Sequence, residues 1–121
     1  MTITMEQCIE ALQGFNKVAN SKLPFKQTYM IAKNIKSLEA VVAPFESKRN
    51  EYIEDLKKTS YDEEGKQVVP DEAAAKFKED VRSLLDKKQK VDIEKVTLKE
   101  KDCSELSAND IKGCIDYIIV E

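Results

Sequence analysis

Three cysteines, Cys8, Cys103 and Cys114, are the residues of this 121-residue sequence best suited to covalent or metal chemistry. They are widely spaced and include no Cys-x-x-Cys pair, the spacing that disulfide scaffolds and zinc sites use. The sequence also lacks histidine, the usual base that activates a thiol nucleophile. We therefore predict no catalytic residue, no cofactor and no metal site. We expect the three cysteines to act as small buried hydrophobic side chains of a protein in a reducing compartment, with Cys103 the most exposed of the three.

A basic stretch supplies the second set of candidate residues, because lysines but no acids occur from Ala11 through Leu38. Two of these lysines flank the expected start of a helix, where free N–H groups attract anions. The stretch contains no arginine and no recognised nucleic-acid module, so a solvated lysine face is the simpler interpretation. The candidate partner-contact lysines are Lys22, Lys26, Lys33 and Lys36.

An acidic segment supplies the third set, with seven acids against three lysines between positions 62 and 80. The acids lack the ordered Asp-x-Asp-x-Asp-Gly spacing of a calcium loop, so we do not predict a metal there. We interpret the acidic segment as a contact surface for a basic protein. Alternatively, it mimics the phosphate surface of a nucleic acid. The candidate contact residues are Asp62, Glu63 and Glu64.

An apolar stripe at spacings of three and four residues predicts a long helix at 24–58. Its members are Ile31, Ile35, Leu38, Val42, Phe45, Tyr52 and Leu56. Pro44 lies inside this helix and is expected to kink it without ending it. Arg49 interrupts the stripe, so we expect it to pair with Glu72 or Glu79 of the return helix or to face a partner.

A return helix at 71–89 is predicted to pack against this whole stripe as an antiparallel hairpin. Its apolar positions are Ala74, Phe77, Val81 and Leu84. The connection at 60–70 is expected to be a turn or a β-hairpin tip in which Gly65 takes a positive φ.

The remaining elements flank this hairpin. An N-terminal helix at 4–20 starts with a Thr4–Gln7 capping box, and Gly14 is expected to weaken it by about 1 kcal/mol. A C-terminal helix at 107–119 starts with a second capping box at Ser107. A strand at 91–98, either bulged or in two pieces, is expected to pair with residues 1–4. The predicted fold is a single domain at 1–121, mainly α (α+β with minor β).

Composition restricts the partner classes. The charged fraction of 36% exceeds the usual quarter or so and indicates extensive exposed helix surface. The net charge of −3 provides no overall basic field, so we do not expect nucleic acid as a main partner. No leader pattern and no apolar run of roughly 18 residues is present, so we expect a cytoplasmic protein without a membrane partner.

Several motifs carry a resemblance to a known family. They are the run Lys-Leu-Pro-Phe-Lys-Gln-Thr-Tyr at 22–29, the run Ile-Ala-Lys-Asn-Ile-Lys-Ser-Leu at 31–38, the Asp-Glu-Glu-Gly turn, the Asp-Ile-Glu-Lys-Val strand and the closing Leu-Ser-Ala-x-Asp-Ile helix. With these motifs most of the chain resembles a family of small proteins of unknown function encoded by tailed bacteriophages and prophages. The resemblance implies a phage origin and a helical hairpin, and it implies no catalytic residue. Pro44 departs from the uninterrupted helix of that family.

These observations favour a non-enzymatic phage protein that acts through protein–protein contacts, in virion or tail assembly or as an accessory factor. The first alternative is an inhibitor of a host defence or regulatory protein, and the second is a nucleic-acid-associated protein. The expected partner is a phage structural protein or a host protein. A two-helix hairpin cannot cover all sides of its own stripe, so a second copy is a further candidate. The expected location is the host cell cytoplasm, with incorporation into the virion as the variant.

Overall fold

The computed structural model describes residues 1–58, 64–65 and 71–121. The fold is mainly α with two small two-stranded sheets, as the sequence predicted. In chain order the elements are β1 (Thr2–Thr4), α1 (Met5–Val18), α2 (Phe25–Lys58), α3 (Asp71–Asp86), β2 (Lys88–Lys90), β3 (Val96–Leu98), the 3-10 helix η1 (Glu100–Cys103), α4 (Ala108–Ile111), the 3-10 helix η2 (Lys112–Tyr117) and β4 (Ile118–Val120).

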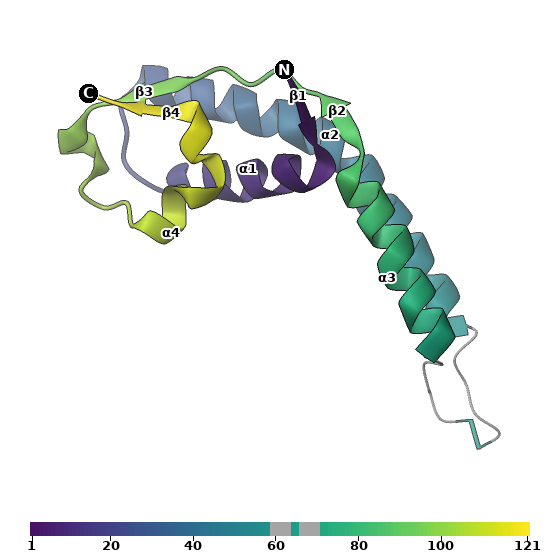
Figure 1. The fold of residues 1–121 in the computed structure, drawn as a ribbon. Coiled ribbons are helices and arrows are strands. Elements are labelled where there is room, and N and C mark those ends of the chain that lie inside the picture. The colour runs from purple at the N-terminus through teal and green to yellow at the C-terminus, as the bar shows by residue number, and fades with distance from the viewer. Residues whose placement is uncertain (59–63, 66–70) are drawn as a thin grey trace.

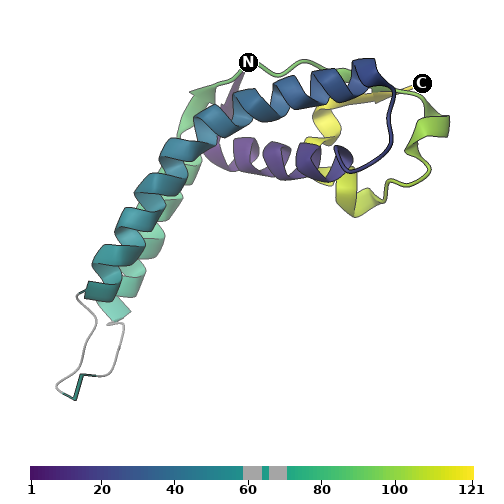
Figure 2. The ribbon, with the colours of Figure 1, turned by 180° about the vertical axis from the view of Figure 1, so that it is seen from behind.

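The molecule consists of a body and a projecting arm (Figure 1). In the body, α1 and the first part of α2 lie beside the strands and the C-terminal elements. The arm consists of residues 46–57 of α2 together with α3, which run side by side away from the body. The view from behind shows that α2 changes direction where it passes from the body into the arm (Figure 2).

Helix α1 begins where the sequence predicted. The Thr4 hydroxyl accepts a hydrogen bond from the Gln7 N–H at 3.2 Å, and the Gln7 side-chain oxygen accepts one from the Thr4 N–H at 2.9 Å. This capping box satisfies donors at both sides of the first turn. The buried face of α1 consists of Met5, Cys8, Ala11, Gly14, Phe15 and Val18.

Two glycines let α1 and η2 approach closely. A Cβ placed on Gly14 would lie 2.6 Å from the Cys114 backbone nitrogen, and one placed on Gly113 would lie 2.3 Å from the Glu10 carbonyl oxygen. No real side chain tolerates such distances, so both positions require the absence of a Cβ. Gly14 is therefore a packing residue as well as the weak helix former that the sequence suggested.

Helix α2 is one uninterrupted helix that contains Pro44, in agreement with the predicted kinked helix. Pro44 lies near Met5 of α1 and Leu84 of α3 around a depression of about 490 Å³, at the place where the arm leaves the body. Proline supplies no N–H to the helix and clashes with the carbonyl four residues earlier, which accounts for a bend there.

The apolar stripe of α2 has two partners instead of one. Ile31, Leu38, Val42 and Phe45 are buried in the core that α1 and β3 help to form. The later part of the stripe faces α3 in the arm. The prediction that the whole stripe docks against the return helix was therefore wrong for its first half, because α1 and the strands occupy that position.

Helix α3 ends at Asp86, three residues before the predicted end at position 89. The next residues form β2, which pairs antiparallel with β1 in the register Thr2↔Lys90 and Thr4↔Lys88. The Met5 N–H also donates to the Lys87 carbonyl at 2.8 Å, so the start of α1 is tied to the end of α3. Pairing with β1 thus satisfies backbone groups that the sequence analysis assigned to a helix.

The predicted strand at 91–98 touches residues 1–4 only at its first residue, where the Val91 N–H donates to the Met1 carbonyl at 3.0 Å. Within 91–98 the regular strand is β3, which pairs elsewhere. Its partner is β4, in parallel and in the register Val96↔Ile118. The two-piece alternative explains the change of parity, because Val91 and Ile93 precede the strand in extended chain and are also buried.

The C-terminal helix predicted at 107–119 is shorter than expected. Its capping box is present, with the Asp110 N–H donating to the Ser107 hydroxyl at 3.3 Å. One turn of α4 then tightens into η2, and the last part of the predicted helix is the strand β4. The close approach of Gly113 to α1 and the pairing with β3 override the helical pattern here.

Candidate functional site

The three thiols lie in surroundings that keep them protonated. Burial raises the pKa of Cys114 from the ordinary 9.0 to about 11, and it also raises the pKa of Cys8. Cys103 is half-buried, and desolvation followed by the charges of Asp102 and Glu100 raises its pKa. Thiolate is the reactive form, so each of these environments disfavours nucleophilic chemistry. The described residues contain no group of three or more cysteines and acids placed to hold a metal ion.

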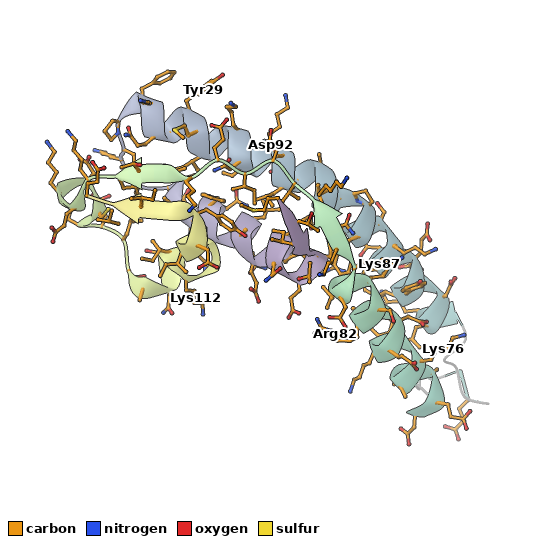
Figure 3. All side chains as sticks on the ribbon, turned by 45° about the horizontal axis from the view of Figure 1, so that its top comes forward. Tyr29, Lys76, Arg82, Lys87, Asp92 and Lys112 are labelled. Carbon is orange, nitrogen blue, oxygen red and sulfur yellow. The ribbon has the colours of Figure 1, made fainter. Side chains whose placement is uncertain are left out.

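The structure gathers the candidate lysines with two aromatic rings that the sequence analysis missed. We call this surface the aromatic–lysine patch, and it consists of Lys22, Phe25, Lys26, Tyr29, Lys33 and Lys36. Phe25 is 82% exposed and Tyr29 is 57% exposed, and their ring centroids lie 6.2 Å apart in a stacked arrangement. Figure 3 shows Tyr29 on the outer side of α2, pointing away from the rest of the molecule.

Lys33 is the lysine of the patch with a defined ionic partner. Its Nζ lies 3.2 Å from a carboxylate oxygen of Glu94 and 5.9 Å from the centre of the Tyr29 ring. The other lysines of the patch are exposed and form no ion pair with a described residue. The patch therefore keeps a positive charge that the described fold does not neutralise.

Asn34 fixes the chain that runs behind the patch. Its side chain is 1% exposed, its Nδ2 donates to the Glu94 carbonyl at 2.8 Å, and its Oδ1 accepts from the Glu94 N–H at 2.9 Å. The Asn34 amide thus satisfies the two backbone groups of Glu94, which a neighbouring strand would satisfy in a β-sheet. The sequence held a signal for this role, since a polar residue stands between Ile31 and Leu38 on the buried face.

The arm presents a partly open apolar seam. Tyr52 and Leu56 of α2 and Ala73 and Phe77 of α3 line a depression of about 290 Å³ whose rim carries Asp55, Lys76 and Asp80. All four lining side chains are only half-buried, and no residue of α3 is fully buried. The hairpin pairing that the sequence predicted is present, but the described residues leave one side of its seam uncovered.

Arg49 does not form the ion pair that was predicted. Neither Glu72 nor Glu79 bridges to it in the described part of the chain, and its Nε is buried without a hydrogen-bond partner. Its guanidinium instead lies 5.8 Å from the centre of the Phe45 ring. A cation above a ring face is attracted by the ring quadrupole, which explains how the charge is accommodated on the stripe.

The acidic tip is described only in part. Asp62 and Glu63 lie outside the described residues, as does the rest of the predicted hairpin tip apart from two positions. Glu64 is exposed in a turn, and Gly65 follows it with a φ of 80°, as the sequence predicted for a turn glycine. The acidic contact surface therefore stays a prediction.

Arg82 anchors α3 to the body. Its guanidinium bonds to the Glu6 carboxylate of α1 and, at 2.7 Å, to the Asp86 carboxylate one turn further along α3. These two carboxylates raise the pKa of Arg82, so the guanidinium stays charged. The Arg82–Glu6 pair joins α3 of the arm to α1 of the body, and Figure 3 labels Arg82 on α3.

Comparisons with protein-family models, with curated proteins and with solved structures find no match to this chain. In the part of the chain that the structure describes, no helix combines the length and the apolar character needed to cross a membrane.

Proposed function

We propose that this chain is a non-enzymatic protein that acts by binding another protein, and that the arm is the contact element. The observation that carries the proposal is the open seam, in which Tyr52, Leu56 and Phe77 are only half-buried. A helix of a partner laid along this seam would complete a three-helix packing, which is how helix-in-groove recognition works. Each large apolar side chain so covered contributes about 1 to 2 kcal/mol.

The rim of the seam indicates the polarity of the partner. The segment at 62–80 carries seven acids against three lysines, and Asp80 and Lys76 of this segment lie at the seam. A partner helix with apolar residues along one stripe and basic residues beside it would complement this rim. This supports the interpretation of the acidic segment as a protein-contact surface.

The resemblance to small phage proteins supports a biological setting. We propose a role in virion or tail assembly or as an accessory factor, within the cytoplasm of an infected cell. Inhibition of a host defence or regulatory protein would use the same arm. A gene position among tail and lysis genes favours assembly, whereas an early-expressed accessory position favours inhibition.

Affinity capture tests the contact. The tagged wild type and the Tyr52→Gln/Phe77→Gln variant are each used to capture proteins from infected cells, and the captured proteins are identified by mass spectrometry. We expect the wild type to retain a protein that the arm variant loses. Helix content by circular dichroism is measured for both, so that loss of the fold is recognised.

The matched control is Ile115→Gln, because Ile115 is 56% exposed on η2 in the body. This variant should retain the same protein as the wild type. Identical capture by the wild type and a folded arm variant would contradict the proposal. If light scattering shows a dimer that the arm variant dissociates, the occupant of the seam is a second copy of this chain.

A further inference from the structure

We propose that the aromatic–lysine patch at the start of α2 binds single-stranded nucleic acid without sequence preference. The patch and the arm lie at opposite ends of α2 (Figure 1), so this inference does not rest on the function proposed for the arm. The sequence argued against nucleic acid because the stretch has lysines without arginine. The exposure of two stacked rings among those lysines is a structural observation that the sequence analysis did not include, and the proposal rests on it.

The side chains of the patch share one side of the helix. With successive helical residues about 100° apart, Phe25, Lys26, Tyr29, Lys33 and Lys36 fall within an arc of about 100°. The core-facing residues of the same turns point the other way, since Ile31 and Leu38 are 1% and 0% exposed. The patch is therefore a continuous outer surface, and the folded body does not use it for packing.

The two rings form a platform on which bases can stack. Every nucleobase has a π face, so stacking on an exposed aromatic ring is favourable for all four bases. The ring centroids of Phe25 and Tyr29 are 6.2 Å apart, more than the roughly 3.4 Å between stacked bases of one strand in a duplex. Bases that engage the two rings separately must first come apart from each other, as they do in a single strand.

The lysines provide the complementary charge. Lys22 and Lys26 bracket Phe25 along the chain, and Lys36 lies on the same arc two turns beyond Tyr29. These three ammonium groups are exposed and can accompany a phosphate backbone as it passes the rings. Lys33 is held by Glu94, so we assign it to positioning the Tyr29 ring and not to phosphate binding.

A single strand fits this surface better than an acidic peptide does. The face of an aromatic ring carries the negative part of its quadrupole, so it repels carboxylates while it accepts bases. An acidic peptide would therefore use the lysines and gain little from the rings. A duplex would engage the lysines, but its bases are stacked inside and cannot reach the rings.

Fluorescence anisotropy with a labelled oligo(dT) of about 12 nucleotides tests the proposal on the full chain. We expect binding at low salt that weakens as salt increases. Phe25→Ala/Tyr29→Ala should weaken it by at least about fivefold per ring at constant salt. In a plot of the logarithm of the association constant against the logarithm of the salt concentration, the slope is negative. It should become less steep by about 2 in the triple variant Lys22→Gln/Lys26→Gln/Lys36→Gln.

Matched controls remove the same groups elsewhere. Ile115→Ala/Ile119→Ala deletes two exposed apolar side chains of the body, 56% and 44% exposed, and should bind as the wild type does. A triple glutamine variant at the exposed lysines of the arm and η2, with the same change in net charge, should keep the wild-type salt slope. Its positions are Lys57, Lys78 and Lys112.

Four results would overturn the proposal. They are the absence of binding at low salt, binding unaffected by loss of the two rings, equal affinity for a duplex of the same length, and displacement of the oligonucleotide by an equal concentration of poly-glutamate. The last result would identify the patch as a surface for acidic proteins. None of these outcomes bears on the arm, whose test uses variants at Tyr52 and Phe77.

Discussion

At the scale of single residues, the fold depends on a buried amide that joins two distant segments. Asn34 of α2 bonds to both backbone groups of Glu94, and this pair of bonds holds the extended chain that leads into β3. The neighbouring Lys33–Glu94 ion pair lies at the surface, with both side chains about half exposed. Two interactions with the same acidic residue therefore differ in burial, and burial decides what each contributes.

Replacing Asn34 by alanine should lower the free energy of unfolding by about 1 to 3 kcal/mol, because both Glu94 backbone groups then lose their partner inside the protein. Lys33→Gln removes two exposed interactions, the ion pair with Glu94 and the contact of the ammonium with the Tyr29 ring, and should cost about 1 kcal/mol or less. Urea denaturation of the two variants measures the difference. Equal losses would show that the amide is no more important than the ion pair.

Because of the buried thiols, the free energy of unfolding should decrease at alkaline pH. The folded-state pKa of Cys114 is about 11 against an ordinary 9.0, so the unfolded chain releases this proton first as pH rises. The contribution of Cys114 is therefore fully present below pH 9 and is lost between pH 9 and about 11. Cys8 acts in the same direction.

We expect the urea concentration at the unfolding midpoint to decrease as the pH is raised from about 8 to about 10.5. The decrease should be smaller in Cys114→Ala, which lacks the titrating group. The two proteins differ in their ionisable groups only at position 114, so the difference between the two slopes isolates this thiol. Parallel slopes would contradict the burial argument.

At the scale of elements, the features predicted correctly are those that depend on local sequence. The capping boxes at Thr4 and Ser107 and the helical spacing of α2 require only residues a few positions apart. The pairings of β1 with β2 and of β3 with β4 join three-residue strands whose partners are chosen by the packing of distant segments. No local pattern encodes that choice, so these pairings were mispredicted.

The candidate sites divide in the same way. The lysines of the patch were identified from their charge, whereas Phe25 and Tyr29 were not singled out, because nothing in the sequence shows that their side of the helix stays uncovered. The helical pairing of the arm was predicted from apolar spacing. Its openness depends on the absence of a third element beside α3 in the described chain, which only coordinates reveal.

The crossing of α1 and η2 yields a prediction that opposes helix propensity. Gly14→Ala should gain about 1 kcal/mol from propensity, but the new Cβ would lie 2.6 Å from the Cys114 nitrogen. We expect the clash to prevail and the variant to be destabilised by about 1 to 3 kcal/mol. Asn16→Ala, at an exposed position of the same helix, is the control and should be neutral or slightly stabilising. A stabilised Gly14→Ala variant would mean that the helices do not cross at this glycine.

At the scale of the whole molecule, α2 connects two parts whose apolar side chains are buried to different extents. Its first half lies in a core where Ile31, Leu38 and Val42 are almost fully buried. Its second half forms the arm with α3, where apolar residues meet on one side only. Pro44 marks the junction, and Arg82 joins α3 back to α1. The molecule is thus a well-packed body that carries an arm whose seam is only partly covered by the described residues, with the aromatic–lysine patch at the other end of α2.

Residue-resolved hydrogen exchange of the isolated protein tests this division most directly. Amides of the arm at 50–57 and 73–83 should exchange at least about 100-fold faster than those of the body at 8–17 and 31–41, because a half-covered hairpin opens without unfolding the core. Equal protection of arm and body would show that the seam is already covered, by the remaining chain or by a second copy. The account of an arm open to a partner would then be wrong.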